Sequence, residues 1–172
     1  MARNVEWKAR LRDPDRALAA ALAAGAADRG VLRQRDTYFA VAHGRLKLRE
    51  QEPGGAELVQ YRRADRAEAR VSDYRVVPAP DPVGLRAALS EALGVRVVVD
   101  KERHLLLHGR TRVHLDAVEG LGSFAEVEVV LAEGDDVAAA REEAERWRDR
   151  LGVAASDVEP RSYADLLLAA SR

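Results

Sequence analysis

A strict alternation of polar and apolar residues near the start of the chain restricts its fold more than any other feature. The polar Asn4, Glu6 and Lys8 alternate with the apolar Val5 and Trp7. A period of two residues is typical of a β-strand with two unlike faces. Four later stretches repeat this alternation. The chain is therefore expected to fold around strands that each have an apolar face and a charged face.

Helix signals separate these strands into groups. Asp13 is a suitable N-cap, Pro14 fits the first helical position and Gly25 fits the stop. Similar signals predict helices over residues 14–24, 82–93, 136–151 and 162–170. Strands are expected over residues 4–11, 33–42, 45–51, 57–63, 70–77, 96–107, 110–118 and 123–131, with residues 66–68 as a charged connection.

The expected strands follow one another through tight turns, so they should pair antiparallel. About eight such strands with few ways to hide their edges favour a closed barrel or a strongly curved sheet, with helices packed outside. The fold class is therefore α+β. The sequence contains no long linker, internal repeat or low-complexity tract, which predicts a single domain over residues 1–172.

Composition excludes several classes of partner. The 172 residues carry a net charge of -1, from 28 Lys and Arg against 29 Asp and Glu, so a bulk nucleic-acid binder is not expected. The absence of cysteine rules out thiolate metal sites and thiol nucleophiles. There is no apolar run of membrane-spanning length and no apolar signal segment after Met1, so no membrane association and a cytoplasmic location are expected.

The charged faces of the strands combine two kinds of side chain. The basic members are Lys8, Arg45, Lys47, Arg49, Arg62 or Arg63, Lys101, Arg103, Arg110 and Arg112. The acidic members are Glu6, Asp116, Glu126 and Glu128. Inside a barrel, so many charges would be costly to bury unless the lumen bound a polyanion together with divalent cations. A triphosphate with Mg²⁺ or Mn²⁺ satisfies both sets.

The alternative is an open sheet whose charged faces lie in solvent, which is the usual reason for such alternation. The opposite faces argue against it, because they are already apolar and match helices that have apolar stripes. Examples are Val5, Trp7, Leu46, Val113 and Val127. If the core lies between this outer face and the helices, the charged faces of the strands face one another across the interior of the barrel.

Several short motifs, in matching order along nearly the whole chain, resemble the CYTH superfamily, the triphosphate tunnel metalloenzymes. Residues 6–8 resemble the end of the ExExK signature, and Lys101 and Arg103 fit a Lys-x-Arg strand. Residues 120–128 resemble the late acidic strand. Residues 159–163 closely resemble the C-terminal part of bacterial class IV adenylyl cyclases.

The resemblance implies a closed tunnel of eight antiparallel strands and a set of site residues. It implies that divalent metal is held by Glu6, Asp116, Glu126 and Glu128. It implies that the triphosphate is bound by Lys8, Lys47, Arg49, Arg62, Lys101 and Arg103, and that Glu6, Lys8, Lys101 and Arg103 are catalytic. Tyr163 would close one end of the tunnel. The chain departs from the family at Asn4, where ExExK has its first Glu, and this removes one negative charge from the metal site.

The activity implied by the resemblance is class IV adenylyl cyclase-like, converting ATP to cyclic AMP and pyrophosphate. The alternatives are hydrolysis of inorganic or thiamine triphosphate, or a non-catalytic phosphate-binding module, which Asn4 favours. The expected partner is a nucleoside triphosphate or another triphosphate, and the resemblance favours a homodimer. His114 lies on the charged face between Arg112 and Asp116, where it could act as a base or support the metal ligands.

Overall fold

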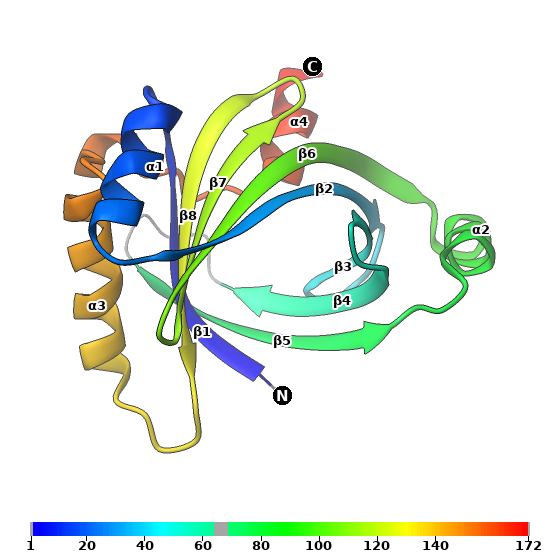
Figure 1. The fold of residues 1–172 in the computed structure, drawn as a ribbon. Helices are drawn as coiled ribbons and strands as arrows, with labels where there is room; N and C mark the ends of the chain where they lie inside the picture. Colours follow the sequence, from blue (N-terminus) through cyan, green and yellow to red (C-terminus); the bar gives the residue numbers. More distant parts are fainter. Residues whose placement is uncertain (1, 64–68, 172) are drawn as a thin grey trace.

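The computed structural model describes residues 2–63 and 69–171 (Figure 1). Its strands are β1 (Ala2–Arg10), β2 (Ala27–Phe39), β3 (Arg45–Glu52), β4 (Ala56–Arg63), β5 (Arg70–Pro78), β6 (Val95–His108), β7 (Thr111–Val118) and β8 (Gly122–Leu131). Its helices are α1 (Pro14–Ala23), α2 (Pro82–Leu93), α3 (Val137–Arg150), the short 3₁₀ turn η1 (Ala155–Asp157) and α4 (Tyr163–Ala170). The connection expected at residues 66–68 lies outside the described residues.

The strands close into a barrel, as one of the two expected sheet forms requires. Their order around the ring is β1-β5-β4-β3-β2-β6-β7-β8, and each neighbouring pair is antiparallel (Figure 1). Closure means that each strand of the described residues is paired on both sides, so none of these strands presents an open edge. It also means that the inward-facing residues of all the strands share one lumen.

β2 is longer than the sequence predicted, because it begins at Ala27 and not at residue 33. Its pairing with β6 shifts register between Asp28 and Val31, and Gly30 in this irregularity has φ of 85°. A positive φ is favourable only for glycine, so Gly30 allows the strand to bulge and then continue. The bulge interrupts the period-two pattern, which explains why sequence alternation did not reveal the first part of β2.

The main hydrophobic core lies outside the barrel wall, as the apolar strand faces predicted. Val5, Trp7 and Val127 pack in one cluster with Ala140 and Trp147 of α3. The same cluster includes alanines of α1, and Figure 1 shows α1 and α3 on the same flank of the barrel. The buried Trp7 Nε1 donates a hydrogen bond of 2.6 Å to the carbonyl oxygen of Ala144. Because the core is on this side, the charged faces point inward.

Helices also cover other parts of the barrel. Tyr163 and Leu166 of α4 pack in a second cluster with Tyr38, Tyr61 and Phe124 from the barrel. α2 packs on β2 and β3 through Leu85 and Leu89, whose neighbours include Leu48. In the part of the chain that the structure describes, none of the helices has both the length and the apolar character needed to cross a bilayer.

Candidate functional site

The barrel encloses a cavity of about 310 Å³, a size at the lower end of the range for ligand pockets. All eight strands and the start of α4 contribute side chains to it. The predicted site residues that line it are Glu6, Lys8, Lys47, Arg49, Lys101, Arg103, Glu126 and Glu128. The structure thus brings most of the predicted set into one lumen, and leaves Arg62 and Asp116 off its lining.

The distribution of lysine is uneven. The sequence contains three lysines, Lys8, Lys47 and Lys101, and each of them lines the cavity. Their exposed fractions are only 2%, 8% and 6%. An ammonium group is strongly hydrated and is costly to bury without anionic partners. The placement of every lysine of the chain in this lumen therefore indicates a site for a negatively charged ligand.

A basic cluster on β2, β3 and β6 is built around one carboxylate, Asp36. Lys47 Nζ lies 2.7 Å and Lys101 Nζ lies 3.0 Å from Asp36 Oδ2. Arg49 donates from Nε to Oδ1 at 2.7 Å and from Nη2 to Oδ2 at 2.8 Å. Three cations therefore converge on a single anion, and the cluster keeps an excess of positive charge that a phosphate chain would neutralise.

The pKa values in this cluster follow from burial and from the neighbouring charges. Burial alone would raise the pKa of the Asp36 carboxyl, but the charges of Arg49, Lys101 and Lys47 outweigh it and hold that pKa well below its usual value. Burial, aided by the Arg49 charge, lowers the pKa of Lys47 to about 7. Asp36 is therefore ionised at neutral pH, while Lys47 is close to its midpoint when the lumen holds no ligand.

Arg103 links the basic cluster to the acidic side of the lumen. Its Nε and Nη2 donate to Asp116 Oδ1 and Oδ2 at 2.7 and 2.6 Å, and Nη2 also lies 2.6 Å from Glu126 Oε2. The Tyr163 hydroxyl donates a further hydrogen bond of 2.9 Å to Asp116 Oδ2. Asp116, which was predicted as a metal ligand, accepts hydrogen bonds on both of its oxygens and thereby orients Arg103 and Tyr163.

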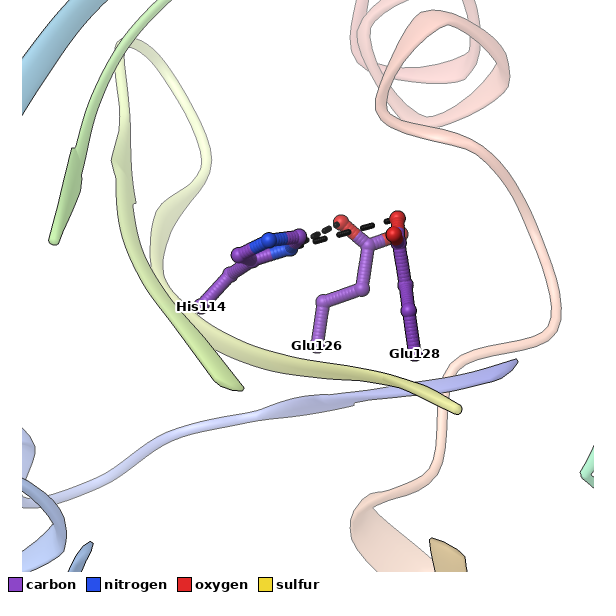
Figure 2. Close-up of side chains that lie close together, drawn as sticks. All are labelled: His114, Glu126 and Glu128. Carbon is purple, nitrogen blue, oxygen red and sulfur yellow. Dashed lines mark ion pairs between the residues drawn. The ribbon is translucent and has the colours of Figure 1, made fainter. Parts of the chain in front are cut away.

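The acidic side of the lumen is formed by β1, β7 and β8. His114, Glu126 and Glu128 place one ligand atom each within 4.8 Å of the others, and Figure 2 shows their side chains converging. Glu6 Oε1 lies 3.6 Å from Arg70 Nε of β5. Burial opposes ionisation of Glu126, but the charge of Arg103 prevails and holds the Glu126 pKa well below its usual value. The Glu126 carboxylate is therefore a charged oxygen ligand.

The donor set of this acidic side fits a divalent cation. Carboxylate oxygens and a neutral imidazole are both common metal ligands. His114 Nδ1, beside Glu126 and Glu128, has no hydrogen-bond partner among the described residues, and neither has Asn4 Oδ1 on β1, the strand that pairs with β8. Buried polar atoms are normally satisfied, so such atoms beside carboxylates are consistent with a bound ion. Of the predicted metal ligands, Glu126 and Glu128 belong to this group, and Glu6 lines the same lumen.

The C-terminal segment contributes to the lining of the cavity, where the family resemblance led us to expect that Tyr163 closes one end. Ser162 and Tyr163 line the lumen, and Lys8 Nζ lies 4.6 Å from the centre of the Tyr163 ring. Lys8 Nζ also donates a hydrogen bond to the carbonyl oxygen of Arg161. Asp165 of α4 holds this segment to β3, because its Oδ2 lies 2.8 Å from Arg45 Nη2. Lys8 therefore connects β1 to the C-terminal segment.

The prediction for Arg62 was wrong about the register of β4. Tyr61 lines the cavity, and the next residue, Arg62, is exposed on the outer face with its backbone opposite Asp73. Successive residues of a strand face opposite sides, so Tyr61 and Arg62 cannot both point inward. Arg63 has the inward parity, and its side chain lies outside what the structure describes.

Two features of the lumen were missed or undervalued from the sequence. Asp36 was not included in the site, although it shares a strand face with Tyr38 and pairs with Arg49 across β2 and β3. Antiparallel pairing of these two strands would have placed the acid among the bases. Arg70 beside Glu6 had no such signal, because it is the first residue of β5.

A closed antiparallel barrel with helices outside and separated clusters of cations and carboxylates inside defines a class of charged tunnel proteins. The chain belongs to the CYTH domain family, whose model matches residues 2–163. Proteins of this family bind triphosphate substrates, depend on metal and are generally enzymes. Family membership and barrel geometry thus agree on the general kind of ligand.

Particular relatives support this assignment. A protein named adenylate cyclase CyaB from Aeromonas hydrophila is 31% identical over 179 aligned positions, covering 95% of this chain and 87% of that protein. The PH1012 protein of Pyrococcus horikoshii OT3 has a similar fold, with a TM-score of 0.85, 23% identity and coverage of 95% of this chain and 98% of that one. A putative adenylate cyclase from Vibrio parahaemolyticus gives a TM-score of 0.73 at 20% identity, covering 96% and 97%.

Proposed function

We propose that this protein binds ATP and a divalent cation, Mg²⁺ or Mn²⁺, in the barrel lumen and converts ATP to cyclic AMP and pyrophosphate. The observation that carries the proposal is the cluster of Lys47, Arg49 and Lys101 around Asp36, on strands that stand across the ring from those of Glu6, Glu126 and Glu128. A triphosphate lying between these sides would meet cations on one and a metal bound by carboxylates on the other. The likeness to adenylate cyclase CyaB supports ATP as the substrate.

In the proposed reaction, the ribose 3′-oxygen attacks the α-phosphorus and pyrophosphate leaves. Lys8, Lys101 and Arg103 would donate to the phosphate oxygens and stabilise the charge that develops on the leaving group. Glu6 would accept the proton of the attacking hydroxyl group. The cation, held by Glu126 and Glu128, would supply further neutralisation of phosphate charge. These roles use the residues that line the cavity.

Hydrolysis of inorganic or thiamine triphosphate is the second candidate, favoured by the size of the cavity. A volume of about 310 Å³ is small for a whole nucleotide and more readily holds a phosphate chain. The same cations would then bind the chain, and a water molecule would attack the terminal phosphorus. The third candidate is a phosphate-binding module without turnover, which Asn4 favours because it provides one carboxylate less on the metal side.

Incubation of the purified protein with ATP, GTP, inorganic triphosphate and thiamine triphosphate, each with Mg²⁺ and with Mn²⁺, separates these candidates when the products are resolved by chromatography. Cyclic AMP supports the cyclase, orthophosphate supports the hydrolase, and tight binding without product supports the binding module. Lys101→Ala should abolish product formation, or triphosphate binding if there is no product. Arg33→Ala on the outer surface is the matched control, because 76% of the Arg33 side chain is exposed. Failure to bind any triphosphate at millimolar concentration would overturn the tunnel proposal itself.

A further inference from the structure

His114 is placed as a member of the acidic group and not merely beside it. It comes from β7 and stands directly opposite Glu126 of β8 in the strand register. Its Nδ1 lies 3.6 Å from Glu126 Oε2 and 4.0 Å from Glu128 Oε1, as the dashed lines in Figure 2 mark. Only 4% of His114 is exposed, so bulk water has little access to hydrogen-bond with this ring. The imidazole nitrogen therefore shares a small enclosed space with two carboxylates.

The surroundings of His114 Nδ1 suit a metal ligand. Both separations exceed the length of a hydrogen bond, and the atom has no hydrogen-bond partner among the described residues. A buried ring nitrogen without a partner is unfavourable. One cation between the three side chains would satisfy the nitrogen and offset the like charges of Glu126 and Glu128 together.

The predicted carboxylate ligands differ in how many of their oxygens are in contact with basic or hydroxyl groups. Asp116 accepts hydrogen bonds from Arg103 and Tyr163 on both of its oxygens. Glu6 Oε1 faces Arg70 at 3.6 Å. Glu126 Oε2 also lies 2.6 Å from Arg103 Nη2, and Glu128 Oε2 lies 3.5 Å from Arg112 Nη1, which leaves Oε1 of each as the oxygen that can face an ion. The group with His114 thus offers one nitrogen and two carboxylates, whereas the sequence led to an expectation of carboxylates alone. This difference in ligand type bears directly on which metal the site selects.

We propose that His114 Nδ1 ligates the cation and that this nitrogen makes the site prefer Mn²⁺ over Mg²⁺. Mg²⁺ is a hard ion that prefers oxygen ligands and keeps much of its water, whereas imidazole is a good ligand for transition-metal dications. The inference deepens the proposed function, since the cation is the one that would accompany the triphosphate there. It is tested without any triphosphate, so its outcome is independent of turnover.

The direct test is pulsed electron paramagnetic resonance of Mn²⁺ bound to the ligand-free protein. A coordinated imidazole is expected to give a ¹⁴N hyperfine coupling, which uniform ¹⁵N labelling replaces by the ¹⁵N pattern. This measurement needs no variant, so it holds whether or not a substitution at His114 folds. Absence of nitrogen coupling in the bound ion, or absence of Mn²⁺ binding at millimolar concentration, would overturn the proposal.

Calorimetric titration with Mn²⁺ and Mg²⁺ tests the selectivity. His114→Asn puts an amide near the position of Nδ1, and we expect it to lower the ratio of Mn²⁺ to Mg²⁺ affinity by about tenfold. His104→Asn is the matched control, because His104 lies on the outer face with Nε2 2.7 Å from Asp28 Oδ1. An unchanged ratio in a folded His114→Asn protein would refute the nitrogen ligand. A protein that binds Mn²⁺ through nitrogen but binds no triphosphate would instead refute the proposed function alone.

Discussion

Asp36 and Lys101, on the neighbouring strands β2 and β6, form an ion pair with both side chains only 1% exposed and with Nζ 3.0 Å from Oδ2. Lys47 and Arg49 bind the same carboxylate. An acid at the centre of an anion site serves a purpose when the ligand is absent, because it is the counter-ion that allows the cations to be buried together. Asp36 thus stabilises the ligand-free barrel and holds the basic side chains where a polyanion can bind them.

Replacing Asp36 by asparagine should destabilise the ligand-free protein and make its stability depend on triphosphate. Loss of one member of a buried ion pair typically costs about 3 kcal/mol or more, and here three cations would be left together. Inorganic triphosphate should recover most of that loss, because a ligand bound only by the folded state stabilises it. Thermal unfolding with and without inorganic triphosphate measures both effects.

Asp28→Asn is the matched control for this experiment, since Asp28 is an exposed carboxylate on the same strand that pairs with His104 on the outer face. Its melting temperature should stay close to that of the unmodified protein. If Asp36→Asn melts at the same temperature as Asp28→Asn without ligand, Asp36 is not the counter-ion of the cluster.

Triphosphate binding should weaken as pH rises above 7 because of Lys47. Burial and the Arg49 charge lower the Lys47 pKa to about 7, so the amine is largely neutral at pH 8 in the empty lumen. Only the charged amine attracts phosphate, so binding at pH 8 should take up a proton at Lys47, and affinity should fall with rising pH until the pKa of Lys47 in the complex is passed.

The lysine content makes this measurable, because three amines, all in the lumen, are the only lysine signals. Reductive methylation with ¹³C-formaldehyde should give a Lys47 resonance that titrates near pH 7 and moves to higher pH with inorganic triphosphate. Lys47→Arg assigns the resonance by its disappearance. A Lys47 resonance that titrates near 10 without ligand would contradict the prediction.

Arg49 and Arg62 form a matched pair for the orientation of side chains in the barrel wall. Arg49 lines the cavity and binds Asp36, whereas Arg62 is exposed on the outer face. Arg49→Ala should lower the affinity for inorganic triphosphate by about tenfold or more, as expected for loss of a charge-assisted contact. Arg62→Ala should leave this affinity unchanged. Isothermal titration gives both values. A larger loss for Arg62→Ala would place the register of β4 in error.

The barrel could be predicted from the sequence because polar and apolar residues alternate along its strands, which gives each strand two unlike faces. Trp7 and Val127 on one face and Lys8 and Glu126 on the other identify which side meets the helices, and the structure places them so. What alternation cannot fix is the starting parity of a strand with charge at two successive positions. Arg62 and Arg63 are such a pair, and the assignment failed there.

The site was less predictable than the fold because pairings between distant side chains decide it. Asp116 has the right parity for a metal ligand, yet Arg103 and Tyr163 occupy its oxygens. His114 has the same parity and was given no definite role, yet it faces two carboxylates in the barrel. Parity selects the residues that enter the lumen, and only the closed ring determines which of them meet.

Asn4 stands where the family pattern has a glutamate, and Asn4→Glu should raise cation affinity. The side chain is 3% exposed and lines the cavity, and its Oδ1 has no hydrogen-bond partner among the described residues. The next inward residue of β1, Glu6, pairs in register with Glu128. A carboxylate at position 4 would therefore add negative charge beside the metal group, which should tighten Mn²⁺ binding by about tenfold and destabilise the metal-free protein through like-charge repulsion.

Asn4→Gln is the control that separates charge from size, because it gives the same length of side chain as Asn4→Glu without the charge. Calorimetry with Mn²⁺ should show that Asn4→Glu binds the ion more tightly than Asn4→Gln. Thermal unfolding in the presence of a chelator should show that Asn4→Glu is the less stable of the two metal-free proteins. Turnover of ATP or inorganic triphosphate should rise with the added carboxylate if the missing charge limits catalysis. Equal Mn²⁺ affinities for the two variants would mean that position 4 lies too far from the ion to act on it, and that the departure from the family pattern does not set the activity of this chain.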